Sequence, residues 1–423
     1  MSTGREPKRD ERSILVGALA RQVIGDGLVV LPGQGNSLAV ETDHGVVVLD
    51  VSGYGHASGM LETLRSHTDA PIHAVVCSHG HLGYNAALAV WQQHNADRGD
   101  PPFRVVAHEN LPNRNARYRE TMPLQARLAS MQFPGSATLD QLIAGLPIHD
   151  PTETFAERLM LVDGQRRVEL IWAPSEVDDA LAMWLPDDGL LCGGPATPGF
   201  SIPNIGTPLR TQRFTIRWAD TLDRLAALGA DRLLTEFGPI VEGAEAVHHQ
   251  LTATAEALRW LRAEVVERMN RGMDEHEIVA DMTYPPELFD QPWMQPNYGD
   301  PDYIVRDLFR EENGWWDRNP TTLHPSPPAA ASDAVRSAIT DPDAVLARSR
   351  ELQAAGETQL ALHVIDLLAL APGEDADVVA ARELKAELCR ERAKQVRPFV
   401  SRSLYGSSAR LLDDGHTSWT HLP

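Results

Sequence analysis

The chain has 423 residues, 43% of them hydrophobic and 23% charged, which is the composition of a soluble globular protein large enough for more than one domain. Its 59 acidic residues outnumber its 38 basic residues and give a formal net charge of −21. A surface of that charge repels phosphate backbones and anionic lipid headgroups, so we expect no nucleic-acid partner and no membrane partner.

Cysteine usage and the N-terminus predict a cytoplasmic protein. Cys77, Cys192 and Cys389 lie far apart and form no Cys-x-x-Cys motif, which disfavours a disulfide framework or a cysteine zinc site. Residues 1–12 are charged and lack the apolar segment of a secretory signal. No run approaches the roughly 18 apolar residues that a membrane-spanning helix needs.

The first part of the chain has the pattern of a β-meander. After a polar arm over residues 1–24, short β-branched runs end in Gly and Asp turns between residues 27 and 50, which predicts antiparallel strands. A helix over 58–66 and an apolar strand over 72–77 follow. That strand ends abruptly in Ser78-His79-Gly80-His81.

Two histidines one residue apart, just past a strand end, form the first candidate site. His79 and His81 can aim both imidazoles at one point, which supplies two of the ligands that a zinc or iron ion needs. The motif is short, and histidines with this spacing also serve in loops and cores. A helix over 84–95 precedes a strand that ends at His108, which is either a group close to the site or a structural histidine.

An acidic segment later in the chain adds a second set of candidates. Residues 120–155 contain scattered Gly, Pro and Met, and we interpret them as an irregular insertion that covers a pocket. Strands over 167–172 and 181–185 then enclose Glu176, Asp178 and Asp179. These carboxylates are candidate acid–base groups or metal ligands, or they cap the adjoining turn.

Polar residues beyond this segment are candidate substrate contacts. Asn204, Arg210 and Arg213 lie in a segment that contains Pro and Gly, and the planar guanidinium of arginine suits sulfate or carboxylate. The alternative is that they are solvated residues of a surface loop.

The rest of the chain is predicted to be mostly helical. Leu258, Leu261 and Val265 recur at helical spacing, and the stretch 284–301 must be a packed loop. Trp315 and Trp316 are interpreted as packing anchors. A linker rich in Pro, Ala and Ser over 326–332 precedes helical hairpins that continue to residue 412.

These motifs, taken together, resemble the metallo-β-lactamase superfamily, and in particular its alkylsulfatase-like branch. The His-x-His loop, the segment from Glu176 to Asp179 and the two tryptophans before the helical region carry the resemblance, which extends roughly over residues 25–412. It implies an α/β fold, the αββα metallo-β-lactamase sandwich, followed by an all-α domain of helical hairpins that makes the contact of a homodimer. The expected parts are an arm over 1–24, the metallo-β-lactamase-like domain over 25–245, a bridging segment over 246–325, the dimerisation domain over 326–412 and a tail over 413–423.

The sequence departs from the family's metal-binding pattern. The resembled enzymes bind two zinc ions through six or seven ligands, of which this chain keeps His79 and His81. The other ligand positions are matched here to residues that do not replace a strong ligand: Gly83, Tyr84, Ala180, Pro195 and Phe237. The resemblance therefore implies that the site for a second metal is absent.

Three functional hypotheses remain open. The first is an enzyme that acts on a small molecule by acid–base elimination, isomerisation or cyclisation, without a cofactor or with at most one zinc or iron ion. Its candidate catalytic residues are His79, His81, Tyr84, Glu176, Asp178 and Asp179, and its candidate substrate-binding residues are Asn204, Arg210, Arg213 and His108. The second is a hydrolase of a sulfate ester, thioester or lactone with one zinc ion on His79, His81 and Glu176. The third is a non-catalytic dimeric binding protein.

Overall fold

The structure is a computed structural model that describes residues 22–135 and 138–418. The expected N-terminal arm lies almost wholly outside the described residues, as does part of the expected tail. The chain divides into two compact units, the first formed by residues 1–122, 143–273 and 278–309 and the second by 123–142, 274–277 and 310–423. The boundaries predicted from sequence stay predictions.

The first unit contains two β-sheets. In the seven-stranded sheet the strands follow one another in chain order, β1 to β4 antiparallel and β4 to β7 parallel. Its strands are β1 (Gln22–Gly25), β2 (Leu28–Gly33), β3 (Gly35–Thr42), β4 (Gly45–Leu49), β5 (Ile72–Val76), β6 (Arg104–His108) and β7 (Glu153–Phe155). The predicted meander and the strand before His79 are therefore confirmed.

The six-stranded sheet has the order β13-β12-β11-β10-β9-β8 and is antiparallel except between β11 and β12. Its strands are β8 (Arg158–Val162), β9 (Val168–Trp172), β10 (Leu181–Leu185), β11 (Leu190–Gly194), β12 (Arg232–Thr235) and β13 (Ile240–Glu242). A short 3₁₀ helix over Pro186–Asp188 joins β10 to β11.

Alternating side chains explain why the two sheets stack. In β2, Leu28 and Val30 enter the core between the sheets, whereas Val29 and Leu31 enter the core under the helices, because successive residues of a strand point to opposite faces. Both faces of β4 are buried in the same way, so all five of its residues are buried. The sequence of such strands is continuously apolar.

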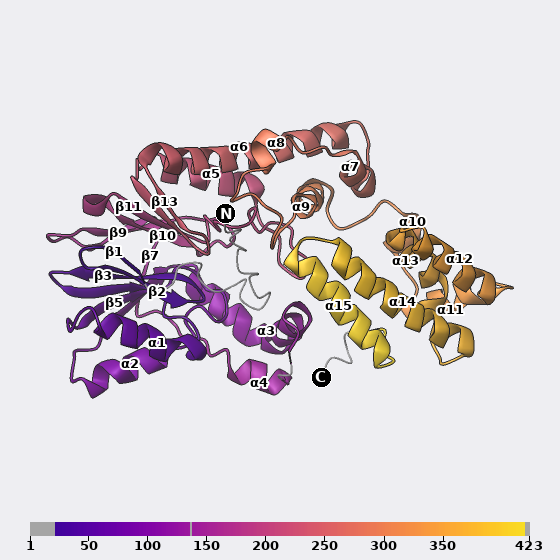
Figure 1. The fold of residues 1–423 in the computed structure, drawn as a ribbon, viewed down its shortest axis with the longest axis horizontal. Coiled ribbons are helices and arrows are strands. Elements are labelled where there is room, and N and C mark those ends of the chain that lie inside the picture. Colours follow the sequence, from indigo (N-terminus) through magenta and orange to yellow (C-terminus); the bar gives the residue numbers. More distant parts are fainter. Residues whose placement is uncertain (1–21, 136–137, 419–423) are drawn as a thin grey trace, which may run out of the picture. The chain divides into compact units, whose positions relative to one another are not determined.

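Helices cover the two outer faces of this sandwich (Figure 1). The helices α1 (Tyr54–Arg65) and α2 (Leu88–Asp97) pack Met60 and Trp91 against the first sheet. On the other side, α5 (Thr215–Ala226) and α6 (Ala244–Asn270) pack Trp218 and Leu258 against the second sheet. The predicted αββα sandwich is confirmed.

Further helices complete the chain. They are α3 (Leu111–Gln132), α4 (Leu139–Ala144), α7 (Glu275–Asp281), α8 (Pro286–Phe289), α9 (Pro301–Asn313) and α10 (Pro320–Leu323). The second unit is built on α11 (Pro328–Ser337), α12 (Pro342–Ala354), α13 (Thr358–Ala369), α14 (Ala376–Gln395) and α15 (Phe399–Asp413). These last helices enclose a core of their own that includes Leu362, Ile365 and Leu384, and this confirms the all-α region.

Several details of the sequence interpretation were wrong. The helix predicted over 58–66 begins at Tyr54, and the stretch 284–301 contains α8. Residues 120–155 are not irregular throughout, because α3 and α4 occupy much of them, with a break in helical geometry at Thr121 just before Pro123. The helix predicted over 84–95 begins only at Leu88. The second half of the expected linker over 326–332 is helical, because α11 begins at Pro328. Proline is tolerated in a first helical turn, and alanine favours the helix that follows. Trp315 does not pack into the core of its unit, because it is 72% exposed.

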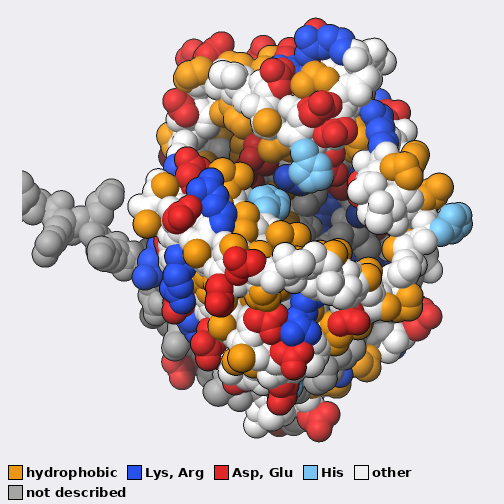
Figure 2. All heavy atoms as spheres, turned by 90° about the vertical axis from the view of Figure 1, so that its right-hand side faces the viewer, with side chains coloured by type: hydrophobic (Ala, Val, Ile, Leu, Met, Phe, Trp, Pro, Cys, Tyr) orange, Lys and Arg blue, Asp and Glu red, His pale blue; other side chains and the backbone are white. Residues whose placement is uncertain are grey.

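The surface carries mixed charge. Figure 2 shows acidic side chains scattered over one face among hydrophobic ones, with Lys and Arg in small groups. Among the described residues, no helix is both long and apolar enough to cross a membrane.

Candidate active site

The site is built where strands of both sheets end. Asp50 directly follows β4, and Ser78, His79 and His81 follow β5, so the parallel pairing of these strands brings the residues to the same edge. Asp50 has a left-handed backbone conformation with φ of 57°, which aspartate tolerates better than most residues. Its buried carboxylate accepts the backbone N–H of Ser78 at 2.9 Å and the Ser78 hydroxyl at 2.5 Å. Burial raises the pKa of Asp50 to about 6.

The two histidines lie edge to face beside each other, with ring centres 4.6 Å apart. Nδ1 of His79 lies 2.8 Å from the Ser78 hydroxyl, whereas its Nε2 is buried and has no hydrogen-bond partner among the described residues. Burial, with Arg114 and Arg213 nearby, lowers the pKa of His79 to about 3, and burial also places the pKa of His81 well below its usual value. Both imidazoles are therefore neutral near pH 7 and keep one lone pair each.

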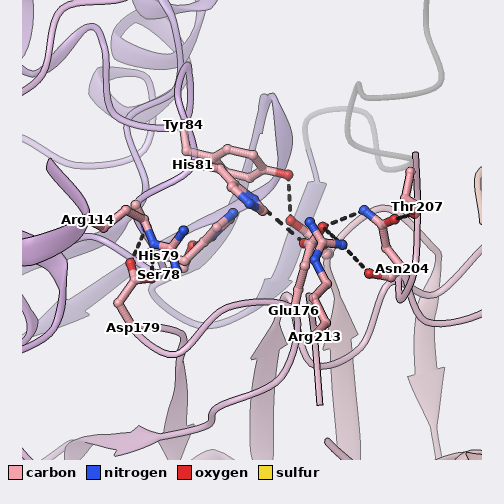
Figure 3. Close-up of polar contacts among 12 residues, drawn as sticks. Ser78, His79, His81, Tyr84, Arg114, Glu176, Asp179, Asn204, Thr207 and Arg213 are labelled. Carbon is pink, nitrogen blue, oxygen red and sulfur yellow. Dashed lines mark hydrogen bonds and ion pairs between the residues drawn. The ribbon is translucent and has the colours of Figure 1, made fainter. Parts of the chain in front are cut away.

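Glu176 faces the histidines from the loop between β9 and β10. Its Oε2 lies 3.7 Å from Nδ1 of His81, while its Oε1 lies 2.7 Å from the Arg213 guanidinium and accepts a 2.5 Å hydrogen bond from Asn204 (Figure 3). Thr207 in turn donates its hydroxyl to the Asn204 side chain. The carboxylate is thus held from one side, and one oxygen remains directed at His81.

The other two predicted carboxylates support the histidine loop. Asp179 is fully buried and accepts the backbone N–H of Gly80 at 2.6 Å and a hydrogen bond from Arg114. Asp178 is half exposed and pairs with the same guanidinium at 2.7 Å. Gly80 is required here, since a Cβ would lie 2.7 Å from the Arg114 side chain and 2.8 Å from an Asp179 oxygen. In this arrangement Asp179 holds the histidine loop in place.

Tyr84 has a partner that sequence reasoning missed. Its phenol donates a 2.5 Å hydrogen bond to Glu236, which follows β12, and its ring lies 4.2 Å from that of His79. Burial and the negative charge of Glu176 raise the pKa of Glu236 well above its usual value, and burial raises that of Tyr84. The sequence interpretation passed over Glu236 in favour of its neighbour Phe237, which packs against Phe200. A carboxylate that follows a short apolar run, as Glu236 follows Leu233 and Leu234, was the available signal.

Comparisons with known proteins agree with this fold. A family model described as "Metallo-beta-lactamase superfamily" matches residues 30–236, and one described as "Alkyl sulfatase dimerisation" matches residues 274–415. The two matches together take in most of the chain. The chain consists of a metallo-β-lactamase domain followed by an alkylsulfatase dimerisation domain.

Two relatives of this alkylsulfatase-like chain are alkylsulfatases from Pseudomonas. A "Linear primary-alkylsulfatase" from a Pseudomonas species is 28% identical over 366 residues, which are 82% of this chain and 68% of the relative. An "(R)-specific secondary-alkylsulfatase" from Pseudomonas is 25% identical over 407 residues, 90% of this chain and 60% of the relative. The chain therefore spans about two thirds of the length of these relatives.

A solved structure shares the fold. It is the stereoselective inverting sec-alkylsulfatase Pisa1 from Pseudomonas, which matches with a TM-score of 0.78 at 23% identity over 94% of this chain and 66% of that one. This similarity confirms the sandwich followed by a helical region that the sequence predicted.

The residues of the alkylsulfatase-like site fit one metal ion of the kind that the superfamily uses. One ligand atom each of His79, His81 and Glu176 lie within 4.8 Å of one another, the one such group among the residues that the structure describes. Two neutral imidazoles and a carboxylate are a donor set typical of zinc or non-haem iron. The buried, unpartnered Nε2 of His79 is the strongest sign that a ligand belongs here, since buried polar atoms are rarely left unpaired.

The remaining predicted residues lie around this cluster in different ways. Arg213 and Asn204 contact Glu176 directly. Arg210 is close enough to His81 for its charge to help lower the pKa of that histidine. His108 instead stacks on Trp172, with ring centres 5.2 Å apart, and its Nδ1 accepts the backbone N–H of Asn110.

Proposed function

We propose that this protein hydrolyses sulfate esters of small alkyl alcohols with the help of one metal ion held by His79, His81 and Glu176. The observation that carries the proposal is the buried Nε2 of His79, which lies without a partner beside a second neutral imidazole and a carboxylate oxygen. The two named Pseudomonas relatives, both alkylsulfatases, support the substrate class.

Each residue of the cluster has a separate task in this proposal. A zinc ion, when bound, lowers the pKa of its water to about 7 and so supplies a nucleophile at neutral pH. The neutral imidazoles offer lone pairs without competing protons, because burial keeps the pKa of His79 near 3. Arg213 and Arg210 place positive charge beside the histidines, which favours an anionic sulfate group in a chain whose net charge is −21.

The test is to measure metal and activity on the same preparations. The purified protein is loaded with zinc or iron(II), desalted and analysed for bound metal, and sulfate release is followed with decyl sulfate and 2-octyl sulfate. We expect one metal ion per chain and sulfate release that stops after chelation and returns with metal. His81→Ala and Glu176→Gln should both lose the metal.

A matched control is Asp178→Asn, which changes a half-exposed carboxylate near the same loop that is not among the proposed ligands. It should keep the metal. Two tightly bound zinc ions per chain, or metal binding that survives both ligand substitutions, would overturn the single-metal proposal.

A second candidate is acid–base catalysis without metal. Two observations favour it. The Arg213 guanidinium already neutralises the Glu176 carboxylate. The Tyr84 hydroxyl and the Glu236 carboxyl group, whose pKa is raised, are proton donors close to His79. Activity of fully chelated protein on an eliminating or isomerising substrate, unchanged by added zinc, would favour this candidate over the first.

We also propose that the region matched as an alkylsulfatase dimerisation domain, residues 274–415, makes the contact of a homodimer. Light scattering coupled to size-exclusion chromatography should give twice the mass of the chain, and a monomer at micromolar concentration would contradict it. The cytoplasmic location stays a prediction, with the three cysteines free and buried.

A further inference from the structure

Ser78 lies between a buried carboxylate and the histidine whose Nε2 has no partner. Its hydroxyl is 2.5 Å from Oδ2 of Asp50 and 2.8 Å from Nδ1 of His79. We propose that Asp50 and Ser78 act as positioning residues that keep the proton of His79 on Nδ1, so that the Nε2 lone pair faces the site. The inference rests on the proposed function only in that His79 is to bind a metal through Nε2.

The number of available protons fixes the direction of the hydrogen bonds from Asp50 through Ser78 to His79, which we call the relay. A hydroxyl has one proton, and an ionised carboxylate can only accept. The Ser78 proton therefore goes to Asp50, and the Ser78 oxygen must accept a hydrogen bond from the remaining neighbour. That neighbour is Nδ1 of His79, which consequently carries the ring proton.

The orientation of Asp50 is fixed independently, from the backbone. The Val51 N–H donates to Oδ1 of Asn85 at 3.1 Å, so the amide nitrogen of Asn85 must point the other way. It points at Oδ1 of Asp50, at 2.8 Å, and the same oxygen accepts the Ser78 N–H at 2.9 Å. A backbone amide thus makes Oδ1 of Asp50 an acceptor, and with the carboxyl group ionised Oδ2 accepts as well, which sets the sense of the remaining hydrogen bonds as far as His79.

The consequence is a preformed ligand atom. In the opposite tautomer His79 would present an N–H to His81 and Glu176, and a metal would have to displace that proton. In the tautomer set by the relay, the buried and unpartnered Nε2 offers its lone pair at once. The ring needs no rearrangement when a cation arrives.

The substitution Asp50→Asn reverses the relay without changing its shape. Because Oδ1 of Asp50 accepts two N–H groups, the side-chain oxygen of an asparagine must take that place, and its NH₂ group then faces Ser78. The hydroxyl would accept from this NH₂ group and donate to Nδ1 of His79. We expect His79 to change to the tautomer that is protonated on Nε2.

The experiment reads the tautomer directly, in the full-length, metal-free protein labelled with ¹⁵N in its histidine rings, at about pH 8. The His79 signals are identified by their absence in His79→Gln. In the wild type we expect a protonated Nδ1 and a bare Nε2, and in Asp50→Asn the reverse. Zinc affinity, measured by competition with a chelator, should fall by about 10- to 100-fold in Asp50→Asn.

Two variants of Ser78 complete the test. Ser78→Thr keeps the hydroxyl and should keep the wild-type tautomer and zinc affinity, whereas Ser78→Ala should give a mixture of tautomers and an intermediate affinity. If Asp50→Asn does not fold, the comparison of Ser78→Thr with Ser78→Ala tests the relay by itself. A His79 ring protonated on Nε2 in the wild type, or a tautomer that is the same in all folded variants, would overturn the relay.

The outcome also separates this inference from the proposed function. Wild-type protein with the expected tautomer that binds no metal would leave the relay standing and remove the metal-dependent hydrolase. Metal-dependent activity together with an unchanged tautomer in Asp50→Asn would support the metal-dependent hydrolase and overturn the relay.

Discussion

At the scale of single residues, the site depends on how one carboxylate is shared. Glu176 gives Oε1 to Arg213 and Asn204 and leaves Oε2 for His81. The Arg213 guanidinium neutralises the Glu176 carboxylate, which a second metal ion would otherwise do. Its positive charge would also repel a second metal ion. This agrees with a site for one metal ion rather than two.

The hydrogen bond between Tyr84 and Glu236 gives a prediction at this scale. Tyr84→Phe keeps the ring against His79 but leaves a buried carboxyl group without its donor. We expect the free energy of unfolding to fall by about 1–3 kcal/mol, measured by urea denaturation.

The control for this prediction is the cycle with Glu236→Leu, which removes the acceptor of the Tyr84 hydroxyl. If the hydrogen bond is the cause, the double variant should lose much less than the sum of the two single losses, since both remove the same interaction. Strictly additive losses would show that Tyr84 stabilises the fold through its ring alone.

At the scale of elements, a loop, a helix and a second loop meet at one buried ion pair. Asp179, between β9 and β10, holds both Gly80 of the histidine loop and Arg114 of α3. These contacts hold the backbone between His79 and His81 at Gly80, although none of them involves a histidine.

Asp179→Ala should therefore be strongly destabilising. The change leaves Arg114, whose side chain is only 10% exposed, without its buried partner, and breaking such a pair costs about 3–5 kcal/mol. Thermal or urea denaturation measures the loss.

The matched control is Asp178→Ala, which removes the half-exposed partner of the same arginine. It should cost less than about 1 kcal/mol, as exposed ion pairs do. Equal losses in the two variants would mean that burial does not distinguish the two carboxylates.

Element by element, the sequence predicts what local pattern controls. The strands before Asp50 and His79 followed from apolar runs that end in turn residues, and both are present. The helix α3 did not follow, because Pro123 and the neighbouring methionines resemble an irregular segment, whereas the chain accommodates the proline at a break in the helix. The start of α11 was missed because a prolyl-alanyl segment has the composition both of a linker and of a first helical turn.

At the scale of the whole molecule, the family resemblance predicted the sandwich and the helical region, because both are set by hydrophobic patterns that span many residues. The contacts within the site were harder to predict. Tyr84 and Glu236 are 152 positions apart, and Asp179 and Gly80 are 99 apart. Only the register of two stacked sheets decides that such residues meet, and no local pattern encodes that register.

The stability of the whole molecule should also depend on one carboxyl group far from the site in sequence. Asp300 is half-buried just before α9, close to the Asp302 carboxylate, and its burial raises its pKa to about 6 from an ordinary value of 3.8. The folded chain therefore holds this proton more tightly than the unfolded chain does. As the pH falls from about 7 toward 4, the folded state takes up the proton first, and the contribution of Asp300 to the free energy of unfolding rises.

Asp300→Asn tests this, because asparagine imitates the protonated carboxyl group and its oxygen can still accept the backbone N–H of Asp302. The variant should be more stable than the wild type near pH 7, and the difference should shrink to about a third by about pH 4.5 and vanish only below the ordinary pKa of 3.8. Urea denaturation of both proteins at the two pH values measures it. The large change in net charge over this range affects both proteins alike, so it cancels in the difference between them. A difference of the same size at both pH values would show that the Asp300 carboxyl group titrates as an ordinary exposed one.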